Sequence, residues 1–212
     1  MFFPYKDDNP RILVPYVTYG IIGLNILIFL FQVGLGQTNQ NLILHFGLIP
    51  AHWSLISLFT SMFLHGGFAH LLGNMWFLWL FGDNVESALG HVRYLIFYFL
   101  CGVGAAVAQT AINLDSLIPM IGASGAISGI LAAYMLQYPK ARVHVFMFLF
   151  IFFTTFRVPA FVVIGFWFLE QLTNGLGSIG LDISGGVAWF AHIGGFIAGA
   201  GLIKLNPLIR IE

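Results

Sequence analysis

Long apolar runs separated by short polar breaks recur along the whole 212-residue chain. A helix needs roughly 20 apolar residues to cross about 30 Å of hydrocarbon, and a soluble core does not repeat such runs so often. The pattern predicts six membrane-spanning helices, over residues 15–35, 69–83, 93–112, 124–138, 158–172 and 187–205. The second and fourth are short, so we expect them to begin below the outer surface.

Two connections between these runs are themselves apolar. The stretch 141–157 contains HVFMFLFIFFTTF, which could form a seventh span, but it is short and flanked by Arg142 and Arg157. We expect it to lie at the membrane interface. The uncharged outer connection 36–68, which holds Trp53, is expected to dip into the headgroup region.

Composition supports a membrane protein. The chain is 59% hydrophobic and 8% charged, with a mean hydropathy of +0.92, whereas soluble domains carry about 25% charged residues. A net charge of zero without a basic cluster argues against nucleic acid as a partner. The single cysteine, Cys101, excludes a disulfide within the chain and a cysteine metal site.

Basic residues set the orientation, because Lys and Arg are retained on the cytoplasmic side of a membrane. With six spans and the N-terminus inside, all eight fall on that side: Lys6, Arg11, Arg93, Lys140, Arg142, Arg157, Lys204 and Arg210. A seventh span would move three of them outside, so six are preferred. We expect a cytoplasmic segment at 1–14, a membrane domain at 15–205 and a cytoplasmic tail at 206–212, in a bacterial cytoplasmic membrane.

Polar residues inside the apolar runs need a reason, since ionisable side chains in a membrane cost about 2.5 to 3.5 kcal/mol on insertion scales. His70 and Asn74 are four positions apart and therefore share one helix face. They could serve as hydrogen-bonding glue between helices. A pair on one face also favours a functional site, while His65 is expected to structure the preceding loop.

Ser124 lies in the glycine-rich stretch IGASGAISG. Gly125 and Gly129 have the four-residue spacing that lets helix backbones approach, so the motif alone is typical of packing. The preceding loop contains Pro119, which predicts that Ser124 begins a helix. Free N–H groups and the helix dipole favour negative charge at that position.

His192 lies in the last apolar run and is followed by Gly195 and Gly199. A lone histidine on an apolar helix is usually a packing residue. The two glycines, however, repeat the spacing that follows Ser124, so the two small faces are expected to pack together. The fourth and sixth spans would then bring Ser124 and His192 within hydrogen-bond distance.

These residues have the parts of an acyl-transfer site. His192 would take the proton from Ser124, which would attack a carbonyl carbon and form an acyl-enzyme. His70, Asn74 and the Ser124 N–H would hold the oxyanion. The expected unit is a Ser–His dyad, because no acidic residue is placed to orient His192.

The sequence lacks the residues that other intramembrane proteolytic mechanisms require. The chain has no His-Glu-x-x-His helix for a metal ion and no pair of intramembrane aspartates. No metal and no cofactor is therefore implied.

Four motifs, HGGFAHLLGNM, GDNVESALG, GASGAISG and AHIGGFIAG, occur in this order. The set resembles the rhomboid intramembrane serine proteases over roughly residues 42–205. The resemblance implies an all-α, polytopic bundle of six transmembrane helices. It also implies that Ser124 is the nucleophile, that His192 is the general base, and that His70 and Asn74 contribute to the oxyanion site.

Glu86 falls on the family's helix-ending Gly-xxx-Glu-xxx-Gly pattern and is expected to be structural. Two positions depart from the family pattern. Ser54 follows Trp53 where many members have arginine, and Ser128 stands where some place an aromatic residue against the histidine. Another aromatic side chain would then have to contact His192.

The resemblance implies cleavage of transmembrane protein substrates near the outer face of the lipid bilayer. The fifth span, with Pro159, Trp167 and Phe168, is a candidate side gate, unless these residues only face lipid. One alternative is a catalytically silent rhomboid-like protein that binds membrane clients. Another is a small transporter that uses its histidines as a proton path.

Overall fold

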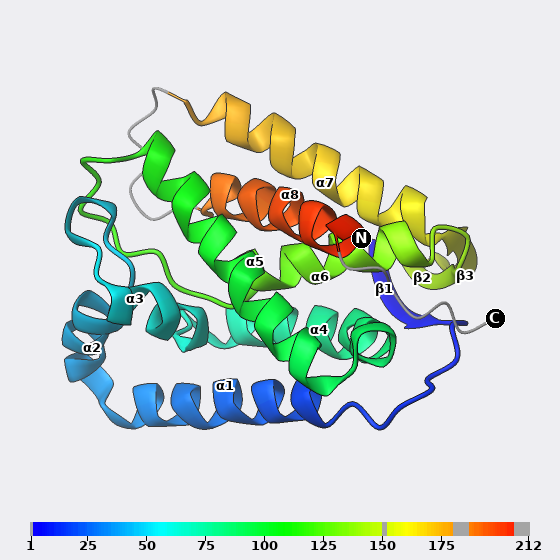
Figure 1. Cartoon of the computed structure of the whole chain (residues 1–212), viewed down its shortest axis with the longest axis horizontal. Helices are drawn as coiled ribbons and strands as arrows, with labels where there is room; N and C mark the ends of the chain where they lie inside the picture. Colours follow the sequence, from blue (N-terminus) through cyan, green and yellow to red (C-terminus); the bar gives the residue numbers. More distant parts are fainter. Residues whose placement is uncertain (1, 150–151, 180–186, 206–212) are drawn as a thin grey trace.

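The computed structural model describes residues 2–149, 152–179 and 187–205 of the chain (Figure 1). The α-helices in these residues are α1 Tyr16–Gly34, α2 Asn39–Phe46, α3 Leu55–Thr60, α4 Phe68–Leu89, α5 His91–Ile112, α6 Ser124–Gln137, α7 Ala160–Gly177 and α8 Trp189–Leu205. The strands are β1 Phe2–Asp7, β2 Arg142–Leu149 and β3 Phe152–Pro159.

Helix α6 forms the centre of the bundle. Its residues 125–134 are all buried, because α4, α5, α7 and α8 surround it (Figure 1). Helices α5 and α8 make the most extensive contacts with it and with each other. Small residues on all three helices permit this close approach, which brings the start of α6 beside the start of α8.

Helices occupy all six predicted positions, and α4 differs most from its prediction. It continues to Leu89, six residues beyond the predicted end at Asp83. The extra turns are stable because their polar side chains have partners on other segments. The carboxylate of Glu86 accepts hydrogen bonds from the start of α1, and the Ser87 hydroxyl oxygen accepts one from the Leu13 N–H at 3.2 Å. At the predicted end itself, Arg11 Nε donates to Asp83 Oδ2 at 3.1 Å.

Two single helices among the described residues, α1 and α5, are long and apolar enough to cross a membrane. A third candidate is the bent pair of α3 with its following turn and α4, which meet at 90°. The predicted count of six spans is therefore not confirmed. Helix α6 has 14 residues, fewer than the roughly 20 that a lone span needs, and lies inside the bundle.

A three-stranded antiparallel sheet, in the order β1-β2-β3, corrects the prediction of an all-α protein. Strands β2 and β3 form a hairpin over most of the stretch that we expected to lie at the interface as a single segment. Val143 and Val145 alternate with the more exposed Arg142 and His144, which is the period of a half-buried strand. The N-terminal segment supplies β1 as an edge strand, where Pro4 is tolerated.

Polar side chains bond this sheet together and to α4. His144 Nε2 lies 2.6 Å from Asp8 Oδ1, and this hydrogen bond lowers the pKa of Asp8. Trp76 on α4 donates from Nε1 to the carbonyl of Pro4 at 2.8 Å. The N-terminal strand is therefore bonded both to β2 and to α4.

The outer connection 36–68 folds into short helices. The Ser54 hydroxyl oxygen accepts a hydrogen bond from the Ser57 N–H, and the Ser57 hydroxyl oxygen accepts one from the Ser54 N–H, which makes a capping box at the start of α3. Ser54 is therefore the N-cap of α3. Leu55 and Ile56 next to it are exposed, as is Trp53.

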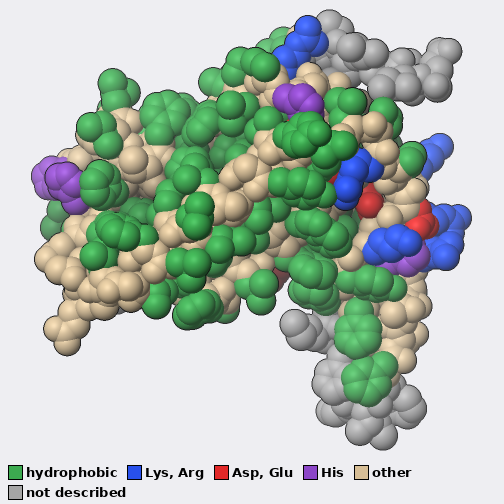
Figure 2. Space-filling view, turned by 90° about the horizontal axis from the view of Figure 1, so that it is seen from below, with side chains coloured by type: hydrophobic (Ala, Val, Ile, Leu, Met, Phe, Trp, Pro, Cys, Tyr) green, Lys and Arg blue, Asp and Glu red, His purple; other side chains and the backbone are tan. Residues whose placement is uncertain are grey.

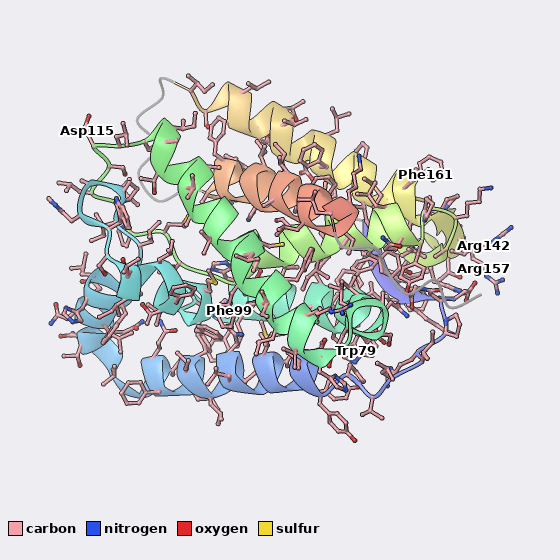
Figure 3. The ribbon with its side chains drawn as sticks, in the orientation of Figure 1. Trp79, Phe99, Asp115, Arg142, Arg157 and Phe161 are labelled. Atoms are coloured by element: carbon pink, nitrogen blue, oxygen red, sulfur yellow. The ribbon has the colours of Figure 1, made fainter. Side chains whose placement is uncertain are left out.

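The basic side chains of the described residues gather at one end of the molecule. Figure 2 shows Lys and Arg on one half of the visible face and predominantly hydrophobic side chains on the other. Arg142 and Arg157 lie at this end, while Asp115 lies at the opposite end (Figure 3). Such segregation is what the positive-inside rule produces in a membrane protein.

Candidate active site

Ser124 is the first residue of α6, as the sequence predicts. The loop before it is held by paired backbone bonds between Leu48 and Met120, and by the bond from the Gly122 N–H to the Ser61 carbonyl at 2.9 Å. Gly122 has φ of 120°, which only glycine adopts readily. No side chain caps α6 within the described residues, so its first N–H groups remain available to an anion.

The glycines of α6 and α8 lie directly against each other. A Cβ atom built on Gly195 would overlap the carbonyl of Gly125, and one on Gly199 would overlap the backbone of Gly129. The two backbones therefore touch without intervening side chains. Any larger residue on these faces would separate the helices.

His192 on α8 lies beside Ser124 as a result of this packing. Its Nε2 atom is 2.8 Å from Ser124 Oγ, within hydrogen-bond distance. The N-terminal end of α8 is fixed to α5, because the Ala191 N–H donates to Gln109 Oε1 at 3.1 Å. The structure thus brings together the two residues that the sequence places 68 positions apart.

Helix α7 holds His192 with two residues that the sequence analysis did not assign to the site. Gln171 Oε1 lies 2.7 Å from His192 Nδ1, and the Trp167 ring centroid lies 5.9 Å from that of His192. Trp167 supplies an aromatic contact in place of Ser128, whose Oγ instead donates to the Ser124 carbonyl. A glutamine within an apolar helix was the signal that could have revealed Gln171.

His70 and Asn74 approach the loop before Ser124 from α4. A Cβ atom on Gly122 would come within 2.7 Å of His70 Nε2 and 3.6 Å of Asn74 Nδ2. The Gly66 N–H donates to His70 Nδ1 at 3.4 Å, which leaves the proton of a neutral ring on Nε2. Among the described residues, Asn74 Nδ2 is buried and has no hydrogen-bond partner.

His65 lies in the turn before α4, is fully buried, and contacts His70 edge-on, with 5.1 Å between the ring centroids. Its backbone N–H donates to Gln32 Oε1 at 3.0 Å, and Gln32 Nε2 donates to the His65 carbonyl at 3.2 Å. These bonds tie the turn to α1. The sequence prediction of a structural position for His65 agrees with this geometry.

A cavity of about 1350 Å³ joins these groups. Ser124, His192, His70 and Asn74 all line it. Phe77 on α4 and Trp167 on α7 also line it, so it reaches between these two helices. A cavity of this size, lined by polar as well as apolar side chains, can admit water and an extended peptide segment inside the bundle.

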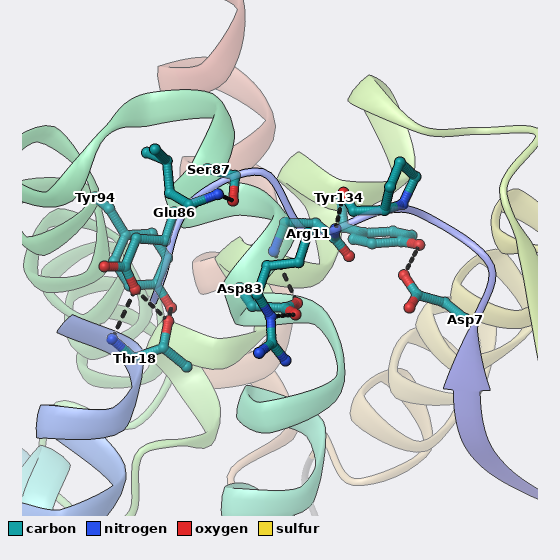
Figure 4. A network of polar contacts seen from close by, with 11 residues as sticks. Asp7, Arg11, Thr18, Asp83, Glu86, Ser87, Tyr94 and Tyr134 are labelled. Atoms are coloured by element: carbon teal, nitrogen blue, oxygen red, sulfur yellow. Dashed lines mark hydrogen bonds and ion pairs between the residues drawn. The ribbon is translucent and has the colours of Figure 1, made fainter. Parts of the chain in front are cut away.

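Glu86 belongs to a separate polar network at the basic end of the molecule (Figure 4). Its carboxylate accepts from the Val17 N–H at 2.9 Å and from the N–H and hydroxyl of Thr18 at 2.8 and 2.7 Å. Helix α1 has no side-chain cap of its own, so Glu86 provides one from α4. The adjacent Gly90 has φ of 76° and ends α4.

Comparison with known proteins agrees with the motif set. The sequence model of the Rhomboid domain matches residues 52–206. Rhomboid protein 1, mitochondrial, from Saccharomyces cerevisiae is 27% identical over 206 residues, which are 93% of this chain and 54% of that protein.

Two further relatives match shorter parts of the chain. RHOMBOID-like protein 4 from Arabidopsis thaliana is 32% identical over 74% of this chain and 34% of its own length. Presenilin-associated rhomboid-like protein, mitochondrial, from Homo sapiens is 33% identical over 58% of this chain and 33% of its own length. The chain therefore spans between a third and about half of these relatives.

Proposed function

This chain belongs to the rhomboid family, and from that premise we propose that it is an intramembrane serine endopeptidase. Its substrates would be transmembrane proteins cleaved near the outer face of the bilayer. The observation that carries the proposal is the 2.8 Å separation of Ser124 Oγ and His192 Nε2 in a cavity at the start of a helix.

The geometry supports a complete acyl-transfer cycle. His192 Nε2 accepts the proton of Ser124 as Ser124 Oγ bonds to the carbonyl carbon of the scissile peptide. Asn74 Nδ2, His70 Nε2 and the Ser124 N–H donate to the resulting oxyanion. His192 then protonates the leaving amine, and the C–N bond breaks to leave an acyl-enzyme.

Water completes the reaction. His192 takes a proton from a water molecule in the cavity, whose oxygen attacks the acyl carbon. The second oxyanion collapses as the proton moves to Ser124 Oγ, which releases a carboxylic acid and restores the serine. Each step uses only the dyad, the oxyanion donors and water.

The substrate must present an extended segment, because every backbone group of a membrane helix is already hydrogen-bonded. Residues such as glycine, serine or proline in the substrate span would lower the cost of unwinding. The proposed entry lies between α4 and α7, where Phe77 and Trp167 line the cavity. Phe168 stacks on Phe196 of α8 at 4.0 Å, so these aromatics do more than face lipid.

The protein is an integral membrane protein, and we propose that its basic end, with the N-terminal segment, lies on the inner side. The predicted tail, 206–212, lies outside the described residues, and we propose the same side for it. Two of the relatives above are named as mitochondrial, which conflicts with the bacterial cytoplasmic membrane expected from the sequence. We therefore propose a location in a membrane and an orientation there, without the bacterial source.

Cleavage of a generic transmembrane substrate in liposomes tests the proposal. We expect Ser124→Ala and His192→Ala to abolish cleavage, since loss of either group in a serine protease costs on the order of 10⁶ in kcat. Ser87→Ala and His45→Ala, which alter residues outside the cavity, are matched controls and should cleave normally. Retained cleavage by Ser124→Ala would disprove the serine mechanism, and binding without cleavage by the unaltered protein would favour a silent client-binding protein.

A further inference from the structure

Gln171 is a buried polar residue in α7, with 3% of its surface exposed. Its amide bridges two groups. Nε2 donates to the carbonyl of Trp167 one turn earlier at 3.2 Å, and Oε1 faces His192 Nδ1 at 2.7 Å. We propose that Gln171 is a positioning residue, which fixes the tautomer and the ring orientation of His192; this rests on the proposed protease function.

The donor and acceptor roles along this chain of atoms are determined. A carbonyl can only accept, so the amide NH₂ of Gln171 must face Trp167 and its oxygen must face His192. The amide oxygen in turn requires a proton on His192 Nδ1. A neutral ring then carries its lone pair on Nε2, the atom that faces Ser124 Oγ.

Trp167 adds a second constraint from the preceding turn of α7. Its ring lies 5.9 Å from the His192 ring at an interplanar angle of 37°. Gln171 holds the edge of the imidazole and Trp167 covers part of its face, so rotation about the side-chain bonds of His192 is restricted. These two residues, one turn apart on α7, therefore align the base toward Ser124.

An amide suits this position better than a carboxylate. In triads an acidic residue orients the histidine and stabilises the imidazolium. A buried charge is costly inside a membrane bundle, whereas an amide supplies the same acceptor while neutral. The cost is weaker stabilisation of the imidazolium, so Gln171 contributes mainly orientation.

Two substitutions of similar size separate these effects. Gln171→Met fills the same space but offers no oxygen. We expect kcat to fall about tenfold to a hundredfold with little change in KM, because a misaligned His192 would lose part of the rate enhancement that general base catalysis supplies. Gln171→Glu keeps an oxygen at the same reach and should retain activity within a few-fold. Where its carboxyl is ionised, the acidic limb of the pH profile should move to higher pH, because a carboxylate favours the protonated ring.

The histidine tautomer provides a readout that does not depend on proteolysis. Nitrogen NMR of histidine-labelled protein should show the Nδ1–H form at His192 in the unaltered chain and a tautomer mixture in Gln171→Met. Glu170→Met, an exposed neighbour on the same helix, should change neither activity nor tautomer. Thermal unfolding of each variant checks that it is folded.

Several results would overturn the inference. Unaltered kcat and an unaltered tautomer in Gln171→Met would show that His192 needs no such partner. Equal losses in Gln171→Met and Gln171→Glu would show that the glutamine acts through packing. Failure of the proposed function looks different, since the unaltered protein would then cleave nothing while the NMR comparison would still report on Gln171.

Discussion

Asn74 Nδ2 is a buried donor without an acceptor among the described residues. Leaving such a group unpaired costs about 1 to 3 kcal/mol. If its purpose were helix packing, a neighbouring oxygen would be expected within reach. Instead, Nδ2 lies 3.6 Å from where a Cβ atom on Gly122 would stand, so it faces the loop that leads into Ser124.

Replacement of Asn74 by alanine should lower kcat about tenfold to a hundredfold and leave KM nearly unchanged. One oxyanion donor is worth about 2.7 to 4 kcal/mol in other enzymes, and His70 and a backbone N–H remain here. The measurement is steady-state cleavage of a transmembrane substrate. Asn84→Ala, an amide at the far end of the same helix, is the control, and an equal loss there would remove the oxyanion role of Asn74.

At the scale of elements, residues from one helix complete another helix or set its distance. Helices α6 and α8 meet through glycines, and the distance between Ser124 and His192 follows from that contact. Helix α1 begins without a cap of its own and takes one from Glu86 on α4. In both cases a helix depends on residues that are distant in the sequence.

Two glycines of α8 offer a matched comparison. Gly195→Ala should lower stability by about 1 to 3 kcal/mol and reduce cleavage, because its Cβ overlaps the Gly125 carbonyl and forces α8 away from α6. Gly201→Ala on the same helix meets nothing within 4 Å and should be neutral or slightly stabilising. Unfolding in detergent and cleavage assays measure both, and equal behaviour of the two variants would contradict close packing.

At the scale of the whole molecule, the two ends are held differently. At the basic end, β1 is bonded to α4 through Trp76 and pairs with β2, while β3 leads directly into α7. The sheet therefore links α4 and α7 at that end. Towards the other end the cavity enters between the same two helices at Phe77 and Trp167, and we propose that they open there.

Joining α4 to α7 should block cleavage if substrates enter between them. Cysteines at Phe77 and at Val163, one turn before Trp167, can be linked with a short reducible thiol crosslinker. We expect activity to disappear on linking and to return on reduction, while each single-cysteine variant treated alike stays active. The buried Cys101 should not react, and full activity of the linked protein would place the entry elsewhere.

The positions of the helices followed from the sequence because a long hydrophobic run in a membrane must pair its own backbone groups, which a helix does. The candidate site residues were chosen from the sequence as well, since polar side chains are costly there and four of them, Ser124, His192, His70 and Asn74, stood out against an apolar background. The structure places these four around one cavity, and their catalytic roles stay predictions. The sequence could not reveal the β1-β2-β3 sheet, because aromatic and β-branched runs are compatible with an interfacial segment or with paired strands. Pairing depends on a distant N-terminal partner.

The sequence by itself determined the family, the apolar bundle and the candidate chemistry, since these depend on residue types and their spacing along the chain. Only the tertiary structure decided which groups meet. Gln171 faces His192 and Trp167 replaces the expected aromatic contact because α7 packs on α8 with one particular rotation about its axis. That rotation depends on contacts between helices, which no local pattern encodes.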